Sequence, residues 1–237
     1  VLSNFGTMAK PYQGGRAAQA GLASVRLAVA GMDAGPEALD DPRGFLFAVS
    51  PNGQVDLASG VPELGVEWGI VNDRLNIKRY PTVGASQRGI DAAVQLHNDH
   101  GSQLNPSTIT KIVPYISERH CAVMPFAQPT TGLEAKFSLE FGVAAALLEG
   151  PVTIHHLSDE FVNRPDVQAM TSLVEPQIGP DDDPTHTEGA LHDFVTVYLA
   201  DGSVLESEPV RRFRGHGLNP MSGDELEAKF VANTATR

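Results

Sequence analysis

The chain has 237 residues, 41% of them hydrophobic and 19% charged, with a formal net charge of −12. This composition is typical of a globular protein, and the negative charge argues against binding to nucleic acid phosphates. The single cysteine, Cys121, excludes an intrachain disulfide and favours a reducing compartment such as the cytoplasm, and no apolar run approaches the roughly 18 residues of a membrane span.

The first predicted element is a loop that leads into a helix. Residues 1–18 (VLSNFGTMAKPYQGGRAA) place Lys10 in a loop punctuated by Gly, Thr and Pro, and apolar residues recur at helical spacing over 15–30. Unpaired N–H groups and the dipole at a helix start favour an anion. A lone lysine in a loop is usually a solvated surface charge. Binding of a carboxylate or a phosphate by Lys10, with Arg16 beside it, is the alternative that this position suggests.

Helical periodicity and turn residues predict a series of short elements after the first helix. Helices are expected at 35–39, 88–97, 134–149, 165–173 and 222–233, the last opened by a capping box. Strands are expected at 108–116, 194–199 and 203–208, with Asp201-Gly202 as the hairpin turn between the last two. The pattern predicts an α+β fold in which helices pack on a small antiparallel sheet.

Four stretches of the sequence together resemble one enzyme family. They are GTMAKPYQGGRAAQAG at 6–21, IKRYP at 77–81 with GIDAA at 89–93, EAKFSLEFGVAAALLEG at 134–150, and SGDELEAKFVAN at 222–233. In this order and spacing they are similar to segments of the MmgE/PrpD family. That family includes 2-methylcitrate dehydratase, cis-aconitate decarboxylase and iminodisuccinate epimerase.

The resemblance implies an all-helical domain interrupted by a smaller α+β lid domain with an antiparallel sheet. Residues 1–74 would be the late part of the helical domain, 75–214 the lid, and 215–237 the return to the helical domain. The family's earlier and last helices would then be absent from this sequence, which begins at Val1 rather than at Met. We expect a piece of a longer protein, and the resemblance implies a homodimer.

The resemblance also implies a carboxylate site. Family members place the lysines that match Lys10 and Lys78 near the substrate carboxylates, one from each domain. Two ammonium groups can neutralise a di- or tricarboxylate and stabilise the enolate-like charge that forms when an α-proton leaves. Because Pro81 keeps Tyr80 extended, Lys78 and Arg79 are expected to point to opposite sides.

Three positions depart from the family pattern. Gln13, Val83 and Gln87 stand where relatives carry histidine, the second of these in cis-aconitate decarboxylase. Glutamine can bind a carboxylate or hydroxyl, but it cannot act as a general base near neutral pH. We predict that these three residues and Arg79 bind the substrate, and that the acid and the base come from helices outside this sequence.

The function that the resemblance implies is that of a cofactor-independent lyase. It would remove water from a small di- or tricarboxylate, as 2-methylcitrate dehydratase does in propionate catabolism. Epimerisation and decarboxylation use the same chemistry and remain alternatives, although the missing histidines make decarboxylation less favoured. A truncated member that binds carboxylates without catalysis is a third alternative.

Other titratable residues predict no further site. Cys121 is expected to be an inert thiol on a strand, with His120 on the opposite face; a Cys/His nucleophile pair is the alternative. The adjacent pair His155-His156 is unsuited to one metal ion. The acidic loop at 181–186, which ends in His186, lacks the spacing of an EF-hand. We therefore predict no metal site.

Overall fold

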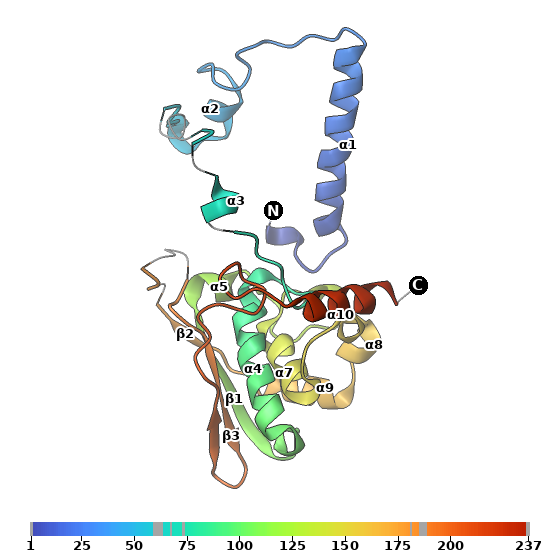
Figure 1. Cartoon of the computed structure of the whole chain (residues 1–237), viewed down its shortest axis with the longest axis vertical. Coiled ribbons are helices and arrows are strands. Elements are labelled where there is room, and N and C mark those ends of the chain that lie inside the picture. The colour runs from blue at the N-terminus through green and yellow to red at the C-terminus, as the bar shows by residue number, and fades with distance from the viewer. Residues whose placement is uncertain are drawn as a thin grey trace. The chain divides into compact units, whose positions relative to one another are not determined.

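The computed structural model describes residues 2–58, 64–66, 68–72, 74–180, 182–184 and 189–235. The chain divides into two units (Figure 1). The larger unit consists of Val1–Lys10 together with Leu75–Arg237, and the smaller unit is Pro11–Arg74. The predicted assignment of residues 215–237 to a separate helical domain stays a prediction.

In the larger unit, the first strand follows the helix at 87–100, and a run of short helices separates that strand from the other strands (Figure 1). Its helices are α4 (Gln87–His100), α5 (Glu118–Ala122), α6 (Gly132–Ala135), α7 (Leu139–Glu149), α8 (Asp159–Val162), α9 (Pro165–Ser172) and α10 (Gly223–Thr234). Two short 3-10 helices of this unit are η4 (Gly84–Ser86), which precedes α4, and η6 (Ile154–Leu157), which precedes α8. The strands are β1 (Ile109–Ser117), β2 (Gln177–Gly179), β3 (Phe194–Leu199) and β4 (Val204–Glu206).

The four strands form one sheet in the order β2-β1-β3-β4. β1, β3 and β4 are antiparallel neighbours, whereas β2 pairs in parallel with the end of β1. The fold is therefore a mixture of helices and a mostly antiparallel sheet, as predicted. The parallel strand β2 was not predicted, because three residues are too few to show a periodic pattern.

The β3–β4 hairpin is confirmed, with a loop one residue longer than the predicted two-residue turn. The Leu199 N–H donates to the Ser203 carbonyl at 2.9 Å and so closes a loop of three residues. Gly202 has a φ of 88°, the left-handed conformation that such loops require at their last position. The Asp201 carboxylate accepts from the Ser203 N–H at 2.9 Å and stabilises the turn.

The core of the larger unit is built on α7, which is buried along most of its length. It packs between α4 and α9, and α4 covers the sheet (Figure 1). The two helices α4 and α7 approach closely at glycines: a Cβ on Gly89 would lie 3.1 Å from Leu139 Cδ1, and one on Gly142 2.9 Å from Ile90 Cδ1. A larger residue at either glycine would push the helices apart.

The predicted helix at 134–149 is two helices, α6 and α7, with a break at residues 136–138. Ser138 caps α7 by accepting the Phe141 N–H at 3.0 Å. Thr131 and Glu134 form a capping box at the start of α6. Serine competes with the helical backbone for hydrogen bonds, so it favours a new helix start at this position over continuation.

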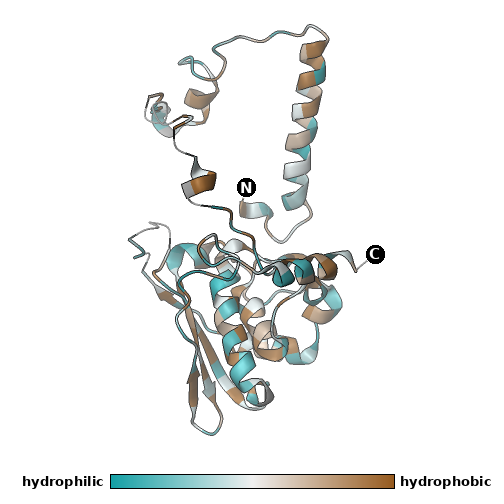
Figure 2. Ribbon diagram, viewed as in Figure 1, coloured by the Kyte–Doolittle hydropathy of each residue, from teal (hydrophilic) through white to brown (hydrophobic). Residues whose placement is uncertain are grey.

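The smaller unit contains the rest of α1 (Ala9–Val29), together with α2 (Phe45–Val49) and α3 (Gly69–Asn72). The helix predicted at 15–30 is confirmed, although it starts earlier. The short helix predicted at 35–39 is wrong: residues 36–40 form turns, and the helix lies later, at α2. No residue of α1 is buried, and Figure 2 shows hydrophobic residues gathered toward its C-terminal end.

None of the helices in the described ranges combines the length and the hydropathy that crossing a bilayer would require.

Candidate functional site

The segment that carries Lys78 and Arg79 is held in place by a buried glutamine. The side chain of Gln87 has 0% exposure. Its Nε2 donates to the Tyr80 carbonyl at 3.1 Å and to Thr82 Oγ1 at 2.9 Å, and its Oε1 accepts from the Tyr80 N–H at 3.1 Å. The amide therefore fixes the backbone that follows the two cations. The predicted contact of Gln87 with the substrate stays a prediction.

A buried carboxylate anchors the same segment to α4 at a second point. The Tyr80 hydroxyl donates to Asp91 Oδ1 at 2.6 Å, and the Arg214 N–H donates to Asp91 Oδ2 at 2.6 Å. The Arg79 guanidinium lies 4.0 Å from the same carboxylate. Burial raises the pKa of Asp91, and the hydrogen bond from Tyr80 opposes that effect. Burial and then the charge of Asp91 raise the pKa of Tyr80.

Lys78 and Arg79 have different neighbours. Lys78 is exposed, and its Cε lies 3.9 Å from the position that a Cβ on Gly84 would take. The Arg79 guanidinium lies 5.6 Å from the centroid of the Tyr80 ring and close to Asp91. Lys78 is therefore the more exposed cation of this pair.

Lys10 has a different setting from the one predicted. α1 begins at Ala9, so Lys10 lies in the first turn of the helix rather than in a loop, and residues 14–16 lie inside the helix. Pro11 does not prevent this start, because proline is tolerated in the first turn. The Lys10 ammonium lies 5.4 Å from the centroid of the Phe5 ring.

The segments that carry Lys10 and Val83 both contact the break between α6 and α7. The Val83 N–H donates to the Lys136 carbonyl at 2.9 Å. The next residue, Phe137, stacks on Phe5 with ring centroids 4.2 Å apart. The structure thus brings the start of the chain and the end of the Lys78 segment to one loop, although they are far apart in the sequence.

Gln13 and Arg16 lie further along α1, in the smaller unit. Gln13 is half-buried. The Arg16 guanidinium donates to Gln19 Oε1 at 2.6 Å and is thus engaged within its own helix. The predicted role of Gln13 in substrate binding stays a prediction.

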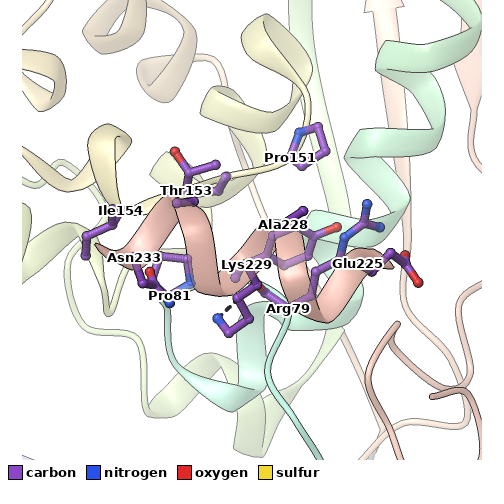
Figure 3. A pocket seen from close by; sticks show the side chains of 12 residues that line it. Arg79, Pro81, Pro151, Thr153, Ile154, Glu225, Ala228, Lys229 and Asn233 are labelled. Atoms are coloured by element: carbon purple, nitrogen blue, oxygen red, sulfur yellow. Dashed lines mark hydrogen bonds between the residues drawn. The ribbon is translucent and has the colours of Figure 1, made fainter. Parts of the chain in front are cut away.

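A cavity of about 260 Å³ lies between α10 and two loops of the larger unit (Figure 3). Residues 79–81 and 151–154 form one side, and α10 contributes side chains from Glu225 to Asn233. The lining is mostly apolar. Its two cations are Arg79 and Lys229, which Figure 3 shows joined by a hydrogen bond. The Lys229 ammonium donates to the Arg79 carbonyl at 3.3 Å.

Glu225 and Lys229, the two charged residues that α10 contributes to the cavity, have different partners. Arg214 binds the Glu225 carboxylate through its Nε at 3.0 Å and its Nη2 at 2.5 Å, which lowers the pKa of Glu225 to about 2. Burial, and secondly the nearby charge of Lys78, lower the pKa of Lys229. Glu225, the acidic residue of α10 that lines the cavity, is therefore neutralised by Arg214 and not by Lys229.

Sequence reasoning did not identify Lys229, although it lies in a stretch that carried the family resemblance. Glu225 and Lys229 are four residues apart on a helix, a spacing that predicts an ion pair between them. The structure pairs Glu225 with Arg214 instead. Lys229 therefore lines the cavity and donates to the Arg79 carbonyl instead of pairing with Glu225. This arrangement depends on contacts between residues that are distant in the sequence.

The prediction that Cys121 lies on a strand is wrong, because Cys121 and His120 both lie on the short helix α5. Burial, and secondly the charge of Glu140, raise the pKa of the half-buried Cys121 thiol. A raised pKa disfavours the thiolate, which agrees with an inert thiol. Burial also raises the pKa of Glu140, which lies in the first turn of α7.

The histidine pair has neighbours within the protein. His156 Nδ1 accepts the Thr153 N–H at 2.8 Å, and its Nε2 lies 3.3 Å from Glu149 Oε2. Within the described ranges, no group of three or more His, Cys, Asp and Glu side chains is placed to hold a metal ion. Asp181 and His186 of the acidic loop lie outside the described residues.

Comparisons with known proteins agree with the motifs. Residues 80–237 match the family model described as the MmgE/PrpD C-terminal domain. Cis-aconitate decarboxylase of Homo sapiens is 30% identical over 240 residues, which cover 99% of this chain and 48% of the relative. Cis-aconitate decarboxylase of Mus musculus is 27% identical over 238 residues, with 99% and 47% covered. The chain thus spans about half the length of the curated relatives it matches.

Proposed function

Because the chain belongs to the MmgE/PrpD family, we propose that it carries the carboxylate-binding part of a lyase that acts on a small di- or tricarboxylate. The observation that carries this proposal is the setting of Lys78. Its ammonium is exposed on a segment that Gln87 and Asp91 hold rigidly, in a protein of net charge −12. A fixed local cation lets an acidic protein bind an acidic metabolite.

Dehydration is the reaction that we propose first. A base removes the α-proton, the electron pair forms the carbon–carbon double bond, and hydroxide leaves the adjacent carbon and takes up a proton as water. Lys10 and Lys78 donate hydrogen bonds to the substrate carboxylates and stabilise the negative charge of the transition state. Gln13, Val83 and Gln87 offer no proton-accepting group, so the base is another residue.

Decarboxylation is the second candidate, and the identity to two cis-aconitate decarboxylases favours it. In that reaction the bond to one carboxylate breaks, carbon dioxide leaves, and the electron pair stays on carbon until a proton arrives. The developing carbanion requires the same stabilisation by cations. In epimerisation a base removes the α-proton, no other bond breaks, and a proton returns to the opposite face of the same carbon.

The architecture forms part of the proposal. We place residues 1–74 and 215–237 in an all-helical domain, residues 75–214 in the lid, and the protein in the cytoplasm as a homodimer. The helices support this assignment: no residue of α1 or α10 is buried, and apolar residues of both are exposed. Amphipathic helices bury such residues against other helices. The single cysteine supports the reducing compartment.

The test compares Lys10→Ala and Lys78→Ala with the unaltered sequence, each in the intact enzyme, using 2-methylcitrate and cis-aconitate as separate substrates. Mass spectrometry distinguishes loss of water from loss of carbon dioxide. Removal of one hydrogen-bond donor that stabilises a developing anion lowers turnover by about 10²–10³-fold. We expect a loss of that size for each variant.

Lys111→Ala is the control, because Lys111 pairs with Glu175 on the surface at 2.6 Å, away from this segment. It removes the same charge and should leave turnover unchanged. Full turnover by both the Lys10 and the Lys78 variants would contradict the proposed site.

A further inference from the structure

Two lysines of the larger unit are held close together without a carboxylate between them. Most cations of this unit have acidic partners, such as Arg88 with Asp193 at 2.7 Å and Lys111 with Glu175 at 2.6 Å. Within the part of the chain that the structure describes, neither Lys78 nor Lys229 forms an ion pair with an acidic side chain. In a chain with 29 acidic and 17 basic residues, such an arrangement needs a physical reason.

The Lys229 ammonium lies next to the segment that carries Lys78. Lys229 donates to the carbonyl of Arg79, the residue that follows Lys78. The charge of Lys78 is near enough to contribute, after burial, to a lowered pKa of Lys229. Like charges repel each other, and partial burial of Lys229 adds a desolvation cost. A bound anion that contacts both groups would remove both penalties.

The surroundings add a further positive field. The Lys78 side chain runs over Gly84, the first residue of η4, which continues directly into α4. α4 has 14 residues, so its dipole contributes positive potential at this end. The neighbouring cavity of about 260 Å³ is lined mainly by apolar groups, including Pro151, Ile154 and Ala228. Such a lining suits the carbon skeleton of an organic acid better than a hydrated inorganic ion.

We propose that Lys78 and Lys229 jointly bind one carboxylate group of the substrate at the edge of this cavity. The inference rests on the proposed function, because it takes the ligand to be a small di- or tricarboxylate. It extends the proposed site to α10, because Lys229 of this helix would contact the substrate. A bound carboxylate would then compete with the Arg79 carbonyl for the hydrogen bond that the Lys229 ammonium donates.

The alternative role for Lys229 is purely structural, with its ammonium holding the Arg79 carbonyl. The two roles differ in what they predict for a ligand. A structural lysine would alter thermal stability without altering affinity for a polycarboxylate. A binding lysine would alter the affinity and would itself be shielded by the ligand.

The experiment measures citrate binding to the intact protein by calorimetry, for the unaltered chain and for Lys78→Met, Lys229→Met, Lys229→Arg and Lys111→Met. We expect Lys229→Met to weaken citrate binding at least about tenfold, as Lys78→Met should, because hydrogen bonds to charged groups are strong. Lys229→Arg should retain most of the affinity. Lys111→Met, with the same change in net charge, should bind as the unaltered protein does.

A second measurement does not depend on the folding of any variant. Acetylation of the unaltered protein by acetic anhydride, followed by peptide mass spectrometry, gives the reaction rate of each lysine with and without citrate. A lowered pKa leaves more of the Lys229 amine neutral and reactive. Citrate should slow acetylation of Lys78 and Lys229 and leave Lys111 unaffected.

The outcomes separate the two proposals. If Lys78→Met loses citrate binding while Lys229→Met does not, and citrate fails to protect Lys229, the inference is wrong and the proposed function stands. If the unaltered protein binds inorganic phosphate but no citrate, or neither, both are wrong. Weakened binding in both variants, with protection of both lysines, supports the pair.

Discussion

At the scale of single residues, the side-chain amide of Gln87 satisfies several hydrogen-bonding groups of the segment at 80–83. It bonds to the backbone N–H and carbonyl of Tyr80, to the Thr82 hydroxyl and, at 3.4 Å, to the Val83 carbonyl. Glutamine can do this because it offers both donors and an acceptor. The residue therefore acts on any ligand of Lys78 through the conformation of the segment.

Gln87→Leu keeps the volume of the side chain but removes all of these hydrogen bonds. The buried N–H and carbonyl of Tyr80 would lose their partner, at a cost of about 1–3 kcal/mol for each unsatisfied group. We expect the free energy of unfolding, measured by urea denaturation, to fall by roughly 2–4 kcal/mol. Gln95→Leu is the control, since Gln95 makes one bond, to the Glu208 N–H, and should cost under about 1 kcal/mol. Equal stability of the two variants would contradict the role assigned to Gln87.

The divergence of Lys78 and Arg79 stays a prediction, and the sequence did not predict what holds this segment. Proline in Lys78-Arg79-Tyr80-Pro81 indicated an extended backbone, and neighbours along such a backbone diverge. The burial of Gln87 could not be predicted, because glutamine is mostly exposed in proteins and its partners here are set by the turn itself. Lys229 was missed for a similar reason, since its neighbours come from distant segments.

At the scale of elements, α6 depends on a glycine at its first position. A Cβ on Gly132 would lie within 2 Å of the Leu157 carbonyl oxygen, which belongs to η6. The Gly132 N–H also donates to Asp159 Oδ1 at 2.7 Å. These two contacts join the start of α6 to η6 and to the start of α8, which follow the loop at 151–154 that lines the cavity.

Gly132→Ala should therefore force these two backbones apart. Overpacking of this kind costs typically about 1–3 kcal/mol, and a backbone oxygen cannot turn aside as a side chain can. Thermal unfolding would show the loss as a lowered Tm. Gly223→Ala offers a matched control, because a Cβ at the first residue of α10 meets no atom within 4 Å. Its Tm should stay the same or rise, and a parallel fall in both variants would argue against a specific clash.

Local signals predicted elements well wherever the chain carries its own start or stop. The capping box of Ser222 and Glu225 opens α10 as expected, and Pro165 begins α9. The predicted strands at 108–116 and 194–199 correspond to β1 and β3. Predictions failed where a competing local preference decided the outcome, as at Ser138, or where pairing in the sheet created a strand of three residues, as in β2.

At the scale of the whole molecule, the two units differ in how much they bury. The described core residues all lie in the larger unit, whereas no residue of α1 or α2 is buried. Leu22, Val25 and Val29 of α1 are more than half exposed. Helical stability in proteins comes mostly from packing of an apolar face, so α1 has little support of its own.

Hydrogen exchange measured by mass spectrometry on the 237-residue chain tests this difference. Amides of α1 should exchange through local opening, several orders of magnitude faster than those of α7, which open with the core. Slow exchange along α1 would contradict this expectation and would show that another surface, such as a second copy of the chain, covers the helix. Dilution of the sample distinguishes a second copy, because its protection would fall with concentration.

The single tryptophan and the single cysteine lie in different units, so they can serve as the two label positions of an energy-transfer measurement. The chain has one tryptophan and one cysteine, and Trp68 lies in the smaller unit while Cys121 lies in the larger. Trp68 is exposed and Cys121 is half-buried. Labelling at alkaline pH, where the thiolate of Cys121 forms despite its raised pKa, attaches a small acceptor dye that pairs with the Trp68 donor. Resonance energy transfer between them follows the separation of the two units in solution, without a single substitution. A titration with citrate would then test, as a change in fluorescence lifetime, whether this ligand alters that separation.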